Sequence, residues 1–198
     1  GGGHMKKAIS LFLACVVLLL SMSGCSVKAQ KDSLAARAGL TSSSQIETVT
    51  LYAGRHPDEW SVDEPFGPKI DPIDLTGTAE GNKYIEALFS DAAVETEGPE
   101  AVLGRGYPLN GFILYSFKED DTLDYTQMTV SVYRDETPYT VDVSLEYTDD
   151  KLWEIMQEDD LSRDGYPRGP GLSSYLLPDT REVWSREYID AIFAEQAK

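Results

Sequence analysis

The stretch FILYSFKEDDTLDYTQMTVSVYRDETPYTVDVSLEY, residues 112–147, decides the fold. Its first part, 112–117, is apolar on both faces, which is typical of a central strand. Residues 125–133 and 139–147 alternate between apolar and polar side chains, so each has one buried and one solvated face. Short acidic turns join the three segments. The pattern therefore predicts an antiparallel three-stranded meander.

Weaker patterns on either side of this meander indicate the remaining elements. Residues 46–53 have the composition of a strand, and a short edge strand is expected at 73–75, after Pro72. Three segments have the spacing of amphipathic helices, namely 79–90, 149–158 and the stretch that follows the expected N-cap Asp179. We therefore expect an α+β fold, in which a single domain has an antiparallel sheet of four to six strands packed on two or three helices.

The sequence also predicts whether two surfaces of this fold are buried or exposed. The helix at 149–158 should bury one side, which carries Leu152, Trp153, Ile155 and Met156. The middle strand has a second face that carries Tyr125, Thr129, Ser131 and Tyr133. That face is either a flat tyrosine-rich patch, if no helix covers it, or a strand face under the final helix.

Composition and charge limit the classes of function. The chain has 198 residues, with 34 acidic and 17 basic side chains, for a net charge of −17. Removing the signal expected at 5–24 takes away Lys6 and Lys7 and no acid, which leaves 15 basic against 34 acidic residues, or −19. Such charge argues against binding of nucleic acid or of anionic lipid by the domain as a whole. The mature chain keeps one cysteine, Cys25, and one histidine, His56, which excludes an internal disulfide and a Cys/His zinc cluster.

The N-terminus resembles the signal of bacterial lipoprotein precursors. Lys6 and Lys7 precede an apolar run of twelve residues, 9–20, which is short for a membrane span. The small residues Ser23 and Gly24, directly before Cys25, resemble the lipobox of that class, although Met22 stands where a branched aliphatic is usual. The resemblance covers residues 5–26. It implies that a diacylglyceryl group alkylates Cys25, that cleavage makes Cys25 the N-terminus, and that the protein is lipid-anchored on the extracytoplasmic face of the cell membrane.

These features divide the chain into four parts. Residues 1–4 precede Met5 and are interpreted as an artificial extension. The signal peptide is expected at 5–24, the lipidated cysteine with a flexible tether at 25–45, and a single acidic α+β domain at 46–198. The small, polar, serine-rich composition after Cys25 favours the tether.

Motifs of catalysis are weak. The chain has no G-x-S-x-G elbow, and His56 lies in a proline-rich loop that cannot orient a catalytic base. We therefore assign no catalytic residue. A carboxylate-dependent envelope hydrolase is the alternative, and it predicts two inward-facing acids in one cleft, one of them with a raised pKa. A purely structural envelope component is a further alternative and predicts no such pair.

One segment partly matches a calcium loop. Residues 160–165 (DLSRDG) place Asp160, Ser162 and Asp164 at the first three ligand positions of an EF-hand, with glycine at position six. The twelfth position is Gly171 instead of a bidentate glutamate. The sequence therefore favours a solvated acidic turn over a weak calcium site, and no cofactor is expected.

Recognition by loops is the function that the sequence favours. Three long Gly/Pro-rich connections, 55–72, 98–110 and 159–178, carry aromatic and arginine residues of the kind found at binding hot spots. The candidate partner-binding residues are Trp60, Phe66, Tyr107, Tyr166 and Arg168. The alternative is that these aromatics pack under their own loops. We expect a binding or interaction module for an envelope protein, a peptide or a saccharide, and a basic peptide would gain most from charge steering.

Overall fold

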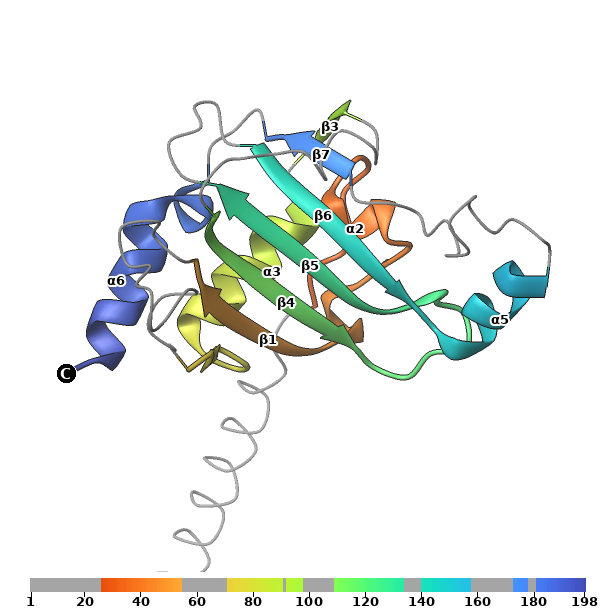
Figure 1. Cartoon of the computed structure of the whole chain (residues 1–198), viewed down its shortest axis with the longest axis horizontal. Helices are drawn as coiled ribbons and strands as arrows, with labels where there is room; N and C mark the ends of the chain where they lie inside the picture. Colours follow the sequence, from red (N-terminus) through yellow and green to blue (C-terminus); the bar gives the residue numbers. More distant parts are fainter. Residues whose placement is uncertain are drawn as a thin grey trace, which may run out of the picture.

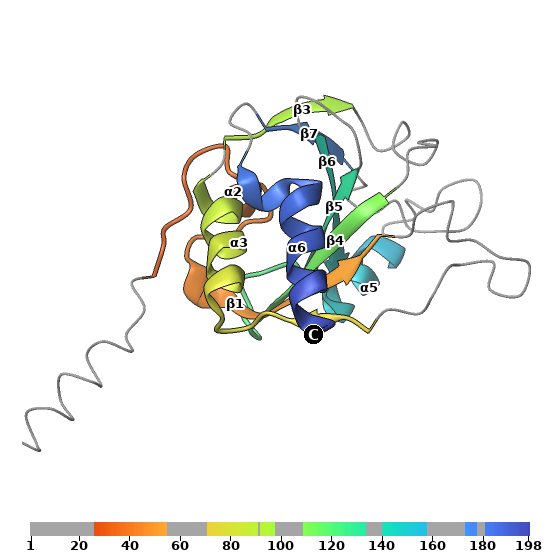
Figure 2. The same ribbon diagram turned by 90° about the vertical axis from the view of Figure 1, so that its left-hand side faces the viewer.

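The central feature of the fold is one antiparallel sheet of seven strands with helices packed against it (Figures 1 and 2). The computed structural model describes residues 26–54, 71–90, 92–97, 109–133, 140–157, 173–177 and 181–198. Within these residues the strand order is β2-β1-β4-β5-β6-β7-β3. The predicted α+β class is confirmed, with a larger sheet than the four to six strands expected from the sequence.

The elements have the following bounds. The strands are β1 (Ile46–Ala53), β2 (Ile73–Asp74), β3 (Val94–Glu97), β4 (Leu109–Phe117), β5 (Tyr125–Tyr133), β6 (Thr140–Tyr147) and β7 (Ser173–Leu176). The helices are α2 (Leu34–Arg37), α3 (Ala79–Ser90), α5 (Asp149–Gln157) and α6 (Arg186–Gln196), with 3₁₀ turns η1 (Ser43–Gln45) and η3 (Glu182–Trp184).

The predicted meander forms the centre of the sheet as β4, β5 and β6. Ile113 pairs with Val130, and Val130 pairs with Val143. On the outer side of β4, Leu51 of β1 pairs with Ile113. All four side chains are buried. Because alternate residues of a strand point to the same face, this register makes one continuous apolar row under the helices.

Helices α3 and α6 supply the other half of the core (Figure 2). Tyr84 of α3 packs edge-on against Trp184 of η3, with ring centroids 5.7 Å apart. Tyr84 and Trp184 are both fully buried. The last helix begins later than predicted, because the Ser185 side chain caps α6 by accepting from the Tyr188 N–H at 3.2 Å. The expected cap, Asp179, lies outside the described residues.

The prediction that residues 26–45 form a flexible tether is wrong. The Ser43 N–H donates to the Val27 carbonyl at 2.8 Å, and the Val27 N–H donates to the Ser43 hydroxyl at 2.8 Å. The Gln30 N–H donates to the Phe89 carbonyl of α3 at 2.9 Å. The apolar side chains of this segment are buried, namely Leu34, Ala35, Ala38 and Leu40. The folded domain therefore begins near Val27, and not at Ile46.

Small polar residues give this segment its structure instead of making it flexible. The Ser33 side chain caps α2 by accepting from the Ala36 N–H at 3.1 Å. Ser42 and Gln45 form a capping box around η1. Serine is favoured at helix N-termini because its oxygen pairs with an N–H that the helix leaves free. The serine run therefore indicates caps, although its composition is also that of a linker.

Candidate functional site

The residues singled out in the sequence as binding candidates lie outside the described residues. This holds for the lipidation candidate and the loop candidates, which are Cys25, Trp60, Phe66, Tyr107, Tyr166 and Arg168. It also holds for the calcium candidates Asp160, Ser162 and Asp164. These predictions stay predictions. In the described part of the chain, no group of three or more His, Cys, Asp or Glu side chains is placed to hold a metal ion.

Helix α5 is positioned by the end of the meander. The Thr148 N–H donates to the Asp124 carbonyl at 2.8 Å, which ties the start of the helix to the turn before β5. The Thr148 hydroxyl then accepts from the Lys151 N–H at 3.3 Å, as an N-cap does. Asp149 and Asp150 lie in the first turn, where negative charge favours the helix dipole. Local interactions therefore account for the helix without tertiary packing.

The predicted burial of the apolar side of α5 is wrong. None of its residues is buried, and Trp153 and Met156 are 62% and 46% exposed. Leu152 and Ile155 are half-buried. The helix follows directly from the end of β6 and lies beyond the rim of the sheet (Figure 1), so the core is not beneath it. We call the exposed side with these four residues the α5 surface.

An acidic cleft of about 770 Å³ lies against the side of α5 that carries Asp150, Lys151 and Glu154. It lies between the first turns of α5 and the turn that joins β4 to β5, with Phe117, Leu123 and Tyr125 among its lining residues. Its carboxylates are Glu47, Glu119, Asp120, Asp121, Asp124, Asp149, Asp150 and Glu154. Lys118 and Lys151 are its two cationic lining residues, so the lining carries eight negative and two positive charges. The cleft therefore attracts cations.

Hydrogen bonds hold one of these carboxylates in its ionised form. The Thr122 hydroxyl and N–H donate to Oδ1 of Asp120 at 2.5 and 2.9 Å. These bonds lower the pKa of Asp120, with a smaller contribution from the Gln45 amide, which donates to Oδ2 at 3.2 Å. A carboxylate of lowered pKa suits cation binding and does not suit proton donation.

Two stacked tyrosines lie at the end of the sheet beside the acidic cleft. Tyr125 pairs with Tyr147, and their ring centroids are 5.3 Å apart. Desolvation is the largest cause of the raised pKa of both phenols. A register irregularity between Tyr125 and Gln127 places Tyr125 opposite Tyr147, so Tyr125 does not share the expected tyrosine patch.

The remaining residues of that patch lie on the face away from the helices. Thr129, Ser131 and Tyr133 are half-buried, whereas their neighbours Met128 and Val130 are buried in the core under α3 and α6. The alternative that the final helix covers this patch is therefore wrong. On the same face, Tyr52 and Phe112 stack with centroids 4.4 Å apart.

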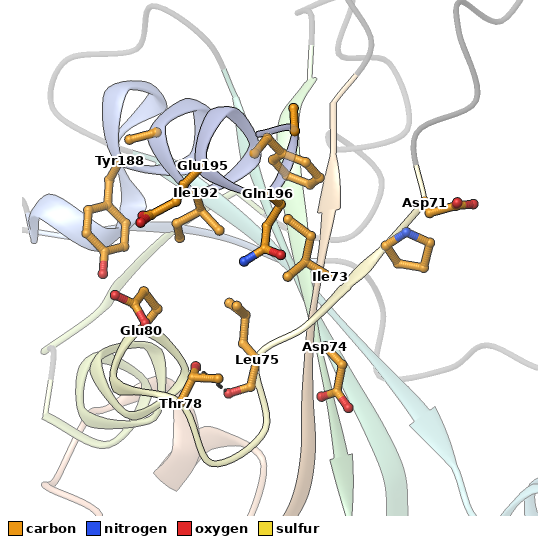
Figure 3. A pocket seen from close by; sticks show the side chains of 14 residues that line it. Asp71, Ile73, Asp74, Leu75, Thr78, Glu80, Tyr188, Ile192, Glu195 and Gln196 are labelled. Atoms are coloured by element: carbon orange, nitrogen blue, oxygen red, sulfur yellow. Dashed lines mark hydrogen bonds between the residues drawn. The ribbon is translucent and has the colours of Figure 1, made fainter.

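A second cleft, of about 750 Å³, lies between the β2 segment and α6 (Figure 3). Its apolar lining includes Ile73, Leu75 and Ile192, and four carboxylates also line it, namely Asp71, Asp74, Glu80 and Glu195. The Thr76 N–H donates to Asp74 at 2.9 Å, and hydrogen bonds from Thr76 lower the pKa of Asp74. The shift is again opposite to the raised carboxyl pKa that a hydrolase requires.

One polar pair was missed in the sequence. The polar side of residues 139–147, which includes Asp142, was expected to be solvated, but Asp142 is 2% exposed and accepts from the Ser174 hydroxyl at 2.5 Å. The two residues are register partners, because β7 adds to the sheet beside β6. Alternation alone placed Asp142 on the correct face but could not show that β7 would lie next to it.

No protein-family model, curated protein or solved structure matches this chain. Its function is therefore inferred from the α5 surface, the acidic cleft and the N-terminal residues.

Proposed function

We propose that this protein is a lipoprotein, anchored on the extracytoplasmic face of the cell membrane, whose domain is a binding module for an envelope protein or peptide. The observation that carries the proposal is the exposure of Trp153 and Met156, at 62% and 46%, on a helix that contributes no buried residue. Contiguous exposed apolar side chains mark interaction sites, and tryptophan and methionine are enriched at interfaces.

The acidic cleft supports a partner of defined chemistry. Asp149, Asp150 and Glu154 line the cleft and belong to the same helix as Trp153. A short helix that presents the α5 surface on one side and lines the acidic cleft with another is complementary to a basic segment that also carries apolar side chains. Long-range attraction to the cleft would speed encounter, and burial of Trp153 would slow dissociation. The proposed partner is therefore a basic protein or peptide.

The anchor in this proposal rests on the lipobox resemblance at Cys25. Two acyl chains hold a protein stably on a bilayer, where a single chain gives marginal binding. In the part of the chain that the structure describes, no helix is long and apolar enough to cross a membrane. Incorporation of a labelled fatty acid into the wild-type protein, and its loss in Cys25→Ser, tests the anchor separately from the binding surface.

A cross-linking pull-down from native envelope membranes tests the binding surface. The bait is the anchored wild-type protein, compared with a Trp153→Ala, Met156→Ala double variant. Val94→Ala is the matched control, because Val94 is also a large exposed apolar residue, at 57%, but lies on β3 at an edge of the sheet. We expect a partner captured by the wild type and by the control and lost from the double variant, with less capture at high salt. Equal capture by the double variant would overturn the proposal.

A further inference from the structure

We infer that the start of the N-terminal segment (residues 26–45) holds the domain directly against an anionic bilayer and turns the α5 surface away from it. This inference rests on the proposed anchor at Cys25. It adds the orientation of the anchored domain and the identity of the membrane-facing surface.

The leash between lipid and domain is short. Val27 is fixed by its two hydrogen bonds with Ser43, and Lys28 forms a β-bridge with Ser42. Ser26 is therefore the sole residue between the lipidated Cys25 and fixed backbone. Since an extended residue spans at most about 3.6 Å, the Cα atoms of Cys25 and Val27 lie within about 7 Å. A free tether of twenty residues would instead have a root-mean-square length of about 25 Å.

The N-terminal segment cannot act as a tether by peeling away from the domain. Leu34 and Leu40 are buried in the main core cluster. The Gln30 N–H donates to the Phe89 carbonyl of α3, and the Arg37 guanidinium donates to the Ala93 carbonyl at 2.6 Å. Detaching the segment would expose these apolar side chains and break these bonds. A lipid on Cys25 therefore holds the folded domain itself close to the bilayer.

Charge selects which surface faces the lipid. The N-terminal segment holds three basic residues (Lys28, Lys31 and Arg37) and one acidic residue (Asp32), for a net charge of +2. Residues 46–198 hold the other 12 basic and 33 acidic residues of the mature chain, for a net charge of −21. An anionic bilayer repels the bulk of the domain and attracts the start of this segment, where Lys28 and Lys31 are exposed. The leash of about 7 Å is shorter than the Debye length of about 8 Å at physiological salt, so Val27 and the neighbouring Lys28 stay within reach of the surface potential.

The same orientation presents the α5 surface to a partner. Figure 2 shows α2 and α3 on one side of the molecule and α5 on the other. With the start of the N-terminal segment at the headgroups, α5, which carries the exposed Trp153 and Met156, lies on the side away from the bilayer. A short leash therefore serves the proposed function, because it keeps the α5 surface accessible in one fixed direction.

Lysine footprinting on vesicles tests this inference. The mature chain is coupled through the Cys25 thiol to a maleimide lipid in phosphatidylglycerol–phosphatidylcholine vesicles, and acetylation of each lysine is followed by mass spectrometry. Lys28 and Lys31 are exposed in the domain, and Lys198, exposed at the end of α6, is the internal control. We expect labelling of Lys28 and Lys31 to fall several-fold relative to a soluble Cys25→Ser protein, while labelling of Lys198 is unchanged.

A matched variant tests whether the short length of the leash causes the protection. Inserting twenty Gly-Ser residues between Ser26 and Val27 should restore labelling of Lys28 and Lys31 on the same vesicles. Equal labelling of the two lysines on vesicles and in solution, or protection that the insertion does not relieve, would overturn the inference. Because the lipid is attached chemically, the footprint tests the orientation of the domain even if cells do not lipidate Cys25. Absence of lipidation in cells would refute the anchor in the proposed function, and not the orientation.

Discussion

Two tryptophans of this chain should respond in opposite ways to the same substitution. Trp153 is 62% exposed on α5, whereas Trp184 is 0% exposed beside Tyr84. Trp184→Ala removes a core side chain and should lower the free energy of unfolding by about 3–5 kcal/mol. For a domain of this size that corresponds to a fall in melting temperature of about 6–20 °C. Trp153→Ala should cost about 1 kcal/mol or less, because most of the side chain faces water.

Binding should show the reverse order of effects. A whole tryptophan side chain offers about 250 Å², so the exposed part of Trp153 offers about 150 Å² to a partner. At about 25 cal/mol per Å² its burial is worth at most about 4 kcal/mol, and measured hot spots begin near 2 kcal/mol. Trp153→Ala should therefore weaken the partner about 30- to 700-fold.

Circular dichroism melting of both variants, together with the pull-down of the Trp153 variant, measures these effects. The reasoning is refuted if Trp153→Ala lowers the melting temperature as much as Trp184→Ala, because Trp153 would then be a core residue. It is also refuted if Trp153→Ala leaves both stability and partner capture unchanged.

Four further predictions concern the fold and its titration. Leu34→Ala should lower the free energy of unfolding, measured in urea, by about 2–5 kcal/mol. A negligible loss would favour the flexible tether over a packed N-terminal segment. Gly81→Ala should lower the melting temperature despite the better helix propensity of alanine, because a Cβ there would lie 2.0 Å from the Leu75 carbonyl oxygen; a rise in melting temperature would contradict the structure. Burial raises the pKa of Tyr84 far above its ordinary 10.0, so its contribution to stability is present below pH 10 and is lost as the pH rises. Tyr84→Phe should remove the late-titrating phenol from an ultraviolet titration. It should also reduce the loss of unfolding free energy at alkaline pH. Hydrogen bonds lower the pKa of Asp120, so its contribution to stability is present above its ordinary pKa of 3.8 and is lost as the pH falls through the pKa of the folded protein. Asp120→Ala should reduce the slope of stability against pH in that acid range. An unchanged slope would contradict this prediction.

The meander could be predicted because its information is local. Alternation alone places Ile113, Val130 and Val143 on one face, and the short acidic turns between the strands allow little choice of register. The pairing of β7 with β6 could not be predicted, because it joins segments about thirty residues apart through a long connection. Burial of Asp142 against Ser174 depends on that pairing.

Two segments were misinterpreted for a related reason. Residues 26–45 have a linker-like composition, but their few apolar residues, led by Leu34 and Leu40, contact distant parts of the chain. Helix α5 has the pattern of a core helix, but the pattern shows an apolar side and not what contacts it. Sequence reasoning therefore located the correct helix and assigned Trp153 and Met156 to the wrong environment.

Photo-cross-linking in intact cells tests the central claim most directly. A benzophenone amino acid at position 153 samples the α5 surface, and the same amino acid at position 94 samples an exposed apolar position on the edge strand β3. The account predicts one discrete adduct from position 153, containing a basic protein or peptide, and none of that mass from position 94. Membrane-associated protein that gives no adduct at position 153, or the same adduct from both positions, would contradict the claim that the α5 surface is the binding site.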